Sequence, residues 1–170
     1  EIAERDYPDI VELRRGYFAA VRPLIADGTV DLLHIDGRHG YEDVREDWET
    51  YRSSLSSRAV VLFHDVCETS PGCRGDRLWS EISGSHPSFL CEHGHGLGVL
   101  MVGDEVPGAL GEVAKAADRD PTAIRSAYAM LGARVARWAD QEELVRSLES
   151  ERDNLIHELD AYGRSLASAR

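Results

Sequence analysis

Positive charge is in short supply in this sequence. Its 170 residues include 19 Lys and Arg against 31 Asp and Glu, which gives a formal net charge of −12 with His neutral. A protein that binds a nucleic-acid backbone or an anionic membrane needs a basic face to neutralise phosphates. The charge balance therefore argues against both as the main partner and favours a neutral or cationic ligand.

Cysteine is also scarce. The chain has Cys67, Cys73 and Cys91, an odd number whose spacing matches neither a zinc-binding pattern nor a disulfide scaffold. We therefore expect reduced thiols and a cytoplasmic location.

Long apolar runs and a leader sequence are missing as well. No run approaches the roughly 18 apolar residues that a membrane-spanning helix needs, and residues 1–6 lack the basic and apolar regions of a signal peptide. We therefore predict no membrane span. Because the chain starts without Met and stops inside a periodic segment, we expect a piece of a longer polypeptide.

The residues that are present favour an α/β fold. Hydrophobic residues make up 42% of the chain, enough to supply a core. Two runs rich in Val, Leu and Ile, at 30–35 and 59–63, are separated by residues 41–55, whose apolar side chains recur every three or four positions. This pattern predicts a β-α-β unit with parallel strands. We also expect a strand at 9–13, helices at 17–26 and 77–83, and a hairpin formed by strands at 89–92 and 97–102.

Polar residues follow both predicted parallel strands. Asp36 and His39 come after the first strand, and His64 and Asp65 come at the end of the second. Ligands bind beyond the carboxyl ends of parallel strands, so we expect these four side chains to face a common cleft. Two simpler roles stay open: Asp36 as the N-cap of the next helix, and His39 as a loop residue without chemistry. We expect His93 and His95 to be turn residues and His34 to lie in a core or interface.

The carboxyl-terminal part of the chain predicts long helices. Pro121 suits the first position of a helix that runs to about Ala139. From residue 141 onwards, apolar residues alternate by three and four, with one polar position at Arg152, which is typical of a coiled coil. We therefore expect a dimer or another partner to bind through 141–170. The predicted domains are 1–104, a helical connector at 105–140, and the coiled-coil helix at 141–170.

Four segments in order, 34–42, 62–65, 78–79 and 93–99, resemble one group of class I S-adenosylmethionine-dependent methyltransferases. That group is often fused to bacterial glycosyltransferases through coiled coils, and it is similar to metal-dependent sugar O-methyltransferases. The resemblance implies a Rossmann-like methyltransferase sheet whose third to seventh strands are present. The glycine-rich turn after the first strand and the acidic end of the second, which hold most of the cofactor in such enzymes, are absent from the chain. Cofactor-binding residues therefore stay unassigned.

The resemblance also implies roles at the strand ends. Asp36 and Asp65 correspond to metal ligands and His39 to the base that takes a proton from a sugar or polyol hydroxyl, within glycan biosynthesis. The implied cofactors are S-adenosylmethionine and a divalent metal, with Mg²⁺ first. His64 stands where an acidic residue is common, and an imidazole ligand suits Zn²⁺, iron or nickel better than Mg²⁺.

Two other functions are compatible with the sequence. The chain could be a non-catalytic methyltransferase-like scaffold that uses its coiled coil for assembly. It could also be a metal-dependent hydrolase or oxygenase in which Asp36, His39, His64 and Asp65 are all ligands.

Overall fold

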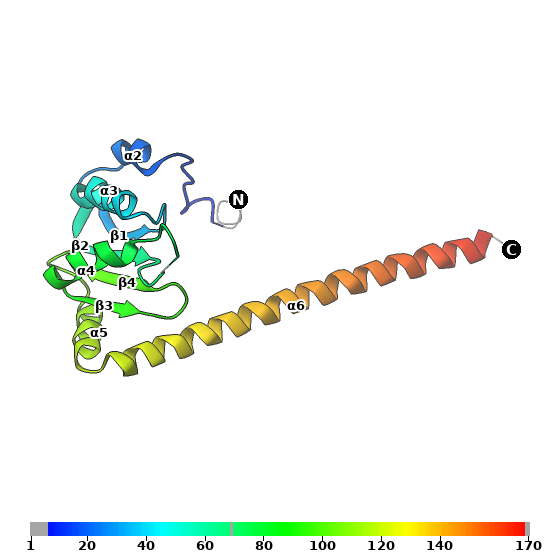
Figure 1. The fold of residues 1–170 in the computed structure, drawn as a ribbon. Coiled ribbons are helices and arrows are strands. Elements are labelled where there is room, and N and C mark those ends of the chain that lie inside the picture. Colours follow the sequence, from blue (N-terminus) through cyan, green and yellow to red (C-terminus); the bar gives the residue numbers. More distant parts are fainter. Residues whose placement is uncertain (1–6, 69, 169–170) are drawn as a thin grey trace. The chain divides into compact units, whose positions relative to one another are not determined.

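The computed structural model describes residues 7–68 and 70–168, except for the side chains of 160–163 and 165–168. The chain divides into two compact units, residues 1–125 and 126–170 (Figure 1). The first six residues of the predicted 1–104 domain, and the side chains at the predicted coiled-coil positions beyond residue 159, lie outside what is described. The first unit holds the sheet, and the second belongs to one long helix.

The described residues of the first unit form one mixed sheet of four strands in the order β1-β2-β4-β3. β1 and β2 are parallel, whereas β4 runs antiparallel to both β2 and β3. The β-α-β unit and the carboxyl-terminal hairpin are therefore confirmed, within an α/β fold. The strands are β1 (Val30–Ile35), β2 (Leu55–His64), β3 (Ser88–Cys91) and β4 (Leu97–Met101).

Helices precede, connect and follow these strands (Figure 1). The predicted helix at 17–26 is a short α-helix continued by a 3-10 turn, because Pro23 lacks the N–H that an α-helical turn would use. The elements are α2 (Phe18–Val21), η1 (Arg22–Leu24), α3 (Tyr41–Tyr51), η2 (Arg52–Ser54), α4 (Gly75–Ile82), η3 (Ser83–Ser85), α5 (Gly108–Arg119) and α6 (Pro121–Ser168).

Two predictions of secondary structure were wrong. The strand expected at 9–13 does not form, because the backbone turns at Tyr7, whose carbonyl accepts hydrogen bonds from the N–H groups of Ile10 and Val11. The described sheet therefore has four strands where the resemblance implied five. The helix that starts at Pro121 does not stop near Ala139 but continues to Ser168. Residues 139–141, where the two helices were expected to meet, contain no Gly or Pro that would end it.

The core of the first unit lies between one face of the sheet and the helices α3 and α4. Phe63 and Val61 on β2 are almost completely buried. Trp48 on α3 packs edge-on against Phe63, with ring centroids 5.6 Å apart, and Trp79 on α4 lies 6.1 Å from the same ring. Trp48 is thus part of the core, and the partly buried Trp79 packs against it. This packing holds the carboxyl ends of β1 and β2 in place.

Tyr51 connects α3 to the segment before the sheet, and its hydroxyl offers a test. The Tyr51 hydroxyl donates a hydrogen bond to the Phe18 carbonyl at 2.9 Å. Tyr51→Phe leaves that carbonyl without its donor, so we expect the free energy of unfolding to fall by about 1 kcal/mol. Urea denaturation followed by tryptophan fluorescence measures the loss. Tyr7→Phe, at an exposed tyrosine, is the matched control; equal losses in the two variants would contradict this role.

Candidate functional site

The candidate site lies where β1 and β2 end. Ile35 pairs with Phe63 in the parallel register. The residues that come next, Asp36 and His64, therefore lie side by side. Ligand atoms of Asp36, His64 and Asp65 all lie within 4.8 Å of one another. The structure therefore brings together the residues that the sequence placed at two separate strand ends.

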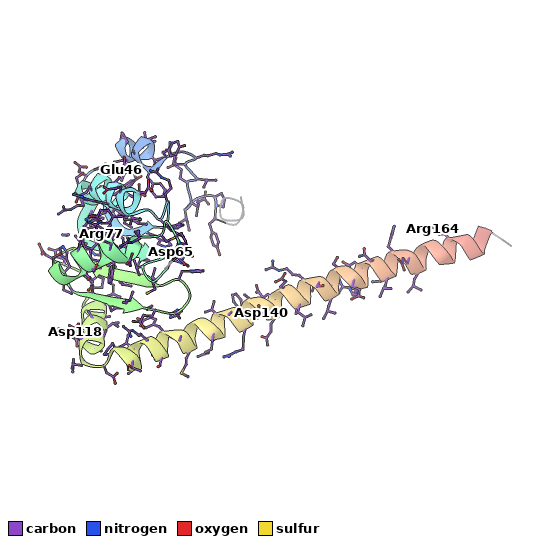
Figure 2. All side chains as sticks on the ribbon, viewed as in Figure 1. Glu46, Asp65, Arg77, Asp118, Asp140 and Arg164 are labelled. Atoms are coloured by element: carbon purple, nitrogen blue, oxygen red, sulfur yellow. The ribbon has the colours of Figure 1, made fainter. Side chains whose placement is uncertain are left out.

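Asp65, which is labelled in Figure 2, is the centre of this cluster. Its Oδ2 lies 2.9 Å from His39 Nδ1, and its Oδ1 lies 2.8 Å from His64 Nδ1. Asp36 Oδ1 approaches the same His64 nitrogen at 3.3 Å. The Asp65 side chain is 13% exposed, while the side chains of the other three are 37% to 45% exposed. One largely buried carboxylate thus touches two imidazoles that remain open to solvent.

The backbone at Asp65 has an unusual conformation. Its φ of 58° makes it the one non-glycine residue with a positive φ in the described part of the chain. Such a conformation costs free energy for a residue with a Cβ, although Asp tolerates it better than most, and it is typical of functional sites. A Cβ at Gly75 would lie 3.3 Å from the Asp65 carbonyl oxygen, so α4 begins in close contact with this residue. In this conformation the Asp65 carboxylate reaches His39 in the loop after β1.

A backbone hydrogen bond joins the two loops that carry the cluster. The Arg74 N–H donates to the His39 carbonyl at 2.8 Å, which ties the loop after β2 to the loop after β1. A second connection comes from the hairpin, where the Cys67 N–H donates to the His95 carbonyl at 2.9 Å. The side chains of His95 and Glu68 also form an ion pair. Hydrogen bonds from Ser70, and then from His95, lower the pKa of Glu68 to about 2.

The structure decides between several simpler roles for these residues. Gly40 is the N-cap of α3, so Asp36 does not cap that helix. His93 and His95 lie in the turn between β3 and β4, as expected, although the contact of His95 with Glu68 left no signal in the sequence. His34 is exposed rather than buried in a core, because no helix covers that part of β1 in the described unit, and its ring packs edge-on against His64.

The donor atoms of the cluster fit a divalent metal. His64 Nδ1 is buried, yet neither nearby carboxylate is oriented to form a hydrogen bond with it, and no other described residue does so. Leaving a buried polar atom unpaired costs about 1–3 kcal/mol, and a cation at this place would remove that cost. One imidazole nitrogen with carboxylate oxygens suits ions such as Zn²⁺, Mn²⁺ or Fe²⁺. Asp36, His64 and Asp65 are the residues that would hold it.

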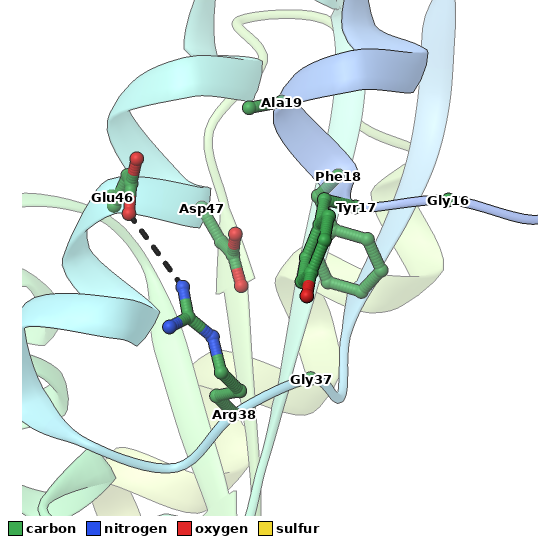
Figure 3. A pocket seen from close by; sticks show the side chains of 8 residues that line it. All are labelled: Gly16, Tyr17, Phe18, Ala19, Gly37, Arg38, Glu46 and Asp47. Carbon is green, nitrogen blue, oxygen red and sulfur yellow. Dashed lines mark ion pairs between the residues drawn. The ribbon is translucent and has the colours of Figure 1, made fainter.

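A cavity of about 420 Å³ lies beside Gly37 and Arg38 in the loop after β1 (Figure 3). Arg38 pairs with Glu46 across it at 3.7 Å, and burial raises the pKa of Asp47. Tyr17 and Phe18 supply aromatic rings, and a Cβ at Gly37 would come within 2.8 Å of the Phe18 ring. No sequence pattern indicated this cavity, because its lining comes from three separate stretches, 16–19, 37–38 and 46–47. It is lined by Gly16, Tyr17, Phe18, Ala19, Gly37, Arg38, Glu46 and Asp47.

Comparison with known proteins links the site to one family. An uncharacterized protein, y4gI of Sinorhizobium fredii (strain NBRC 101917 / NGR234), is 34% identical over 148 residues, which cover 85% of this chain but 16% of that protein. No solved structure matches the chain. None of the described helices is long and apolar enough to cross a membrane. The model of a family described as a methyltransferase domain matches residues 1–66, a segment that contains all four residues of the cluster. Residues 1–66 are thus similar to a methyltransferase domain.

Proposed function

We propose that the chain is the carboxyl-terminal portion of an S-adenosylmethionine-dependent O-methyltransferase domain that acts on a sugar or polyol hydroxyl. His39 is the base, and Asp36, His64 and Asp65 hold a divalent metal. The observation that carries the proposal is the position of Asp65, whose carboxylate touches both His39 and His64 at the ends of neighbouring strands. The family match over residues 1–66 supports the type of reaction.

His39 is well placed to remove a proton. A neutral alcohol is a weak nucleophile, so methyl transfer needs the oxygen in line with the methyl group and its proton removed. With Nδ1 beside Asp65, the His39 ring has Nε2 free to accept the hydroxyl proton, and the carboxylate stabilises the imidazolium that results. The oxygen forms its bond to the methyl carbon as the carbon–sulfur bond breaks, and that electron pair stays on the sulfur.

The proposed metal ligands would help to position the acceptor for this step. A divalent ion held by Asp36, His64 and Asp65 would orient two adjacent hydroxyls of the acceptor and make one of them more acidic. Because His64 replaces an oxygen donor, a transition metal suits the site better than the Mg²⁺ that the resemblance implied.

The cavity beside Gly37 suits the cofactor. S-adenosylmethionine combines a flat aromatic base with a cationic sulfonium centre. The rings of Tyr17 and Phe18 offer stacking surfaces, and Glu46 and Asp47 offer negative charge. We propose that the cofactor uses this cavity and that the protein acts in the cytoplasm, where its three cysteines, which form no disulfide, stay reduced.

Methyl transfer is tested with the complete polypeptide. We expect the label from methyl-labelled S-adenosylmethionine to appear as a methyl ether on at least one member of a panel of sugars and polyols, in the presence of Mn²⁺ or Zn²⁺. NMR of the product identifies the methylated oxygen. Cofactor binding without transfer to any acceptor would favour the scaffold function. Tightly bound iron or zinc with no affinity for the cofactor would favour the hydrolase or oxygenase.

Metal binding gives a prediction that does not depend on activity. We expect the 170-residue chain to bind one Mn²⁺ or Zn²⁺ ion, and Asp65→Asn to weaken that binding by about 10- to 100-fold, because the amide loses the charge of the central carboxylate. Isothermal titration calorimetry measures both affinities. Asp76→Asn, at an exposed carboxylate of α4 that pairs with Arg74, is the matched control and should bind as the wild type does. Equal binding by the Asp65 variant would exclude the proposed ligand set.

A further inference from the structure

The unit formed by residues 126–170 exposes a long apolar stripe. Its described residues all belong to α6, and side chains project from this helix along its length (Figure 2). A single helix gains most of its stability by packing an apolar face against a partner, and the described residues of this unit contain no other element that offers one. The exposed large apolar residues are Met130, Leu131, Val135, Trp138, Leu144, Val145, Leu148, Leu155, Ile156 and Leu159.

Part of this stripe has the spacing of a coiled-coil seam. Val145, Leu148, Leu155 and Leu159 occupy alternating a and d positions of a heptad, and each is between 53% and 70% exposed. In the first heptad, the β-branched Val145 at a with Leu148 at d is the combination that favours two strands in a parallel coiled coil. Arg152 fills the remaining a position and is the one charged residue of this seam. The described seam therefore spans two heptads. The charge at Arg152 distinguishes one register of pairing from the others.

We propose that α6 forms a parallel, in-register coiled coil with α6 of a second copy of this chain, centred on residues 145–159. The charge at Arg152 points to a second copy. In a parallel pair, the residue at an a position packs beside the preceding g position of the partner helix. That g position is Glu151, so each Arg152 would meet an opposite charge, twice by symmetry. Within its own helix, Arg152 pairs with the adjacent Asp153 at 2.7 Å.

The surface of α6 also offers a hollow of the required shape. Trp138, Gln141, Glu142, Val145 and Arg146 line it. The first four are successive a, d, e and a positions, which form the hole that receives a d residue of a parallel partner, and Arg146 at a b position borders it. At that level, a second copy in register presents its own Gln141. This hollow lies one heptad before Arg152, and both features follow the same heptad assignment.

Sedimentation equilibrium of the 170-residue chain tests the proposal without reference to methyl transfer. We expect a dimer, and Leu148→Glu should raise its dissociation constant by at least about 100-fold, because two charges would replace two buried Leu side chains. Ser150→Glu adds the same charge at an f position on the opposite face and should change the constant by less than about twofold. A wild-type monomer at every concentration, a trimer, or equal effects of both substitutions would overturn the proposal.

Disulfide trapping tests the orientation. Under mild oxidation, Leu155→Cys should yield a covalent dimer, since d residues of a parallel in-register pair face each other at disulfide distance. Ser150→Cys should yield no more covalent dimer than the wild type, which reports on the native cysteines. A dimer in sedimentation that Leu155→Cys cannot trap would show an antiparallel or shifted pairing and would overturn the parallel arrangement.

Discussion

We expect His39→Ala to lower the rate of methyl transfer by about 100- to 10,000-fold while leaving the affinity for S-adenosylmethionine unchanged. The alanine removes the ring that would accept the hydroxyl proton, whereas the cavity beside Gly37 keeps all of its lining residues. The measurements are kcat for the complete polypeptide with its acceptor and the dissociation constant of the cofactor by calorimetry. A catalytic base at His39 predicts that kcat falls while the dissociation constant of the cofactor stays the same.

Two controls separate this role from a loss of structure. His93→Ala, at an exposed histidine of the β3–β4 turn, should leave kcat within about twofold of the wild type. Added imidazole should restore part of the activity of His39→Ala, since a free base can enter the space that the ring vacates. Unchanged turnover in His39→Ala would remove His39 as the base. A parallel loss of cofactor affinity would indicate that the residue shapes the site instead.

The fold and the location of the site follow from patterns that a single chain carries. The spacing of Val44, Trp48 and Tyr51 predicts α3, because those side chains fall on one face of a helix, and all three are buried. Once two parallel strands are predicted, their carboxyl ends must meet at one edge of the sheet. The proximity of Asp36 to His64 can therefore be predicted from the sequence alone.

The details of the site are not accessible in this way. The contact between His39 and Asp65 depends on a positive φ at Asp65, and no local sequence signal distinguishes that conformation from an ordinary turn. The cavity beside Gly37 depends on where the loop before α2 comes to lie. The absent strand at 9–13 shows the same limit, since a short apolar pattern forms a strand only where tertiary contacts support it.

Gly103→Ala should be the most destabilising single-methyl change in the sheet unit, lowering the free energy of unfolding by about 3 kcal/mol or more. Gly103 follows β4 and packs on the backbone of β2. A Cβ there would lie 2.2 Å from the Ser57 carbonyl oxygen and 2.5 Å from the Ala59 nitrogen. These are backbone atoms, so no side-chain rotation can relieve the clash. The N–H of Gly103 and that of Val102 both donate to the Ala59 carbonyl at 3.0 Å, so a shift would break both hydrogen bonds.

Gly111→Ala is the matched control. Gly111 lies in α5, and a Cβ there would meet nothing within 4 Å. The same added methyl group should therefore stabilise the protein by about 0.5–1 kcal/mol, because alanine favours the helix and has less freedom in the unfolded chain. Near-UV circular dichroism during urea denaturation follows the sheet unit separately from the helicity of α6. If the contact between β2 and Gly103 is as close as the structure shows, the two substitutions must change the free energy of unfolding in opposite directions. Small and equal changes would contradict that contact.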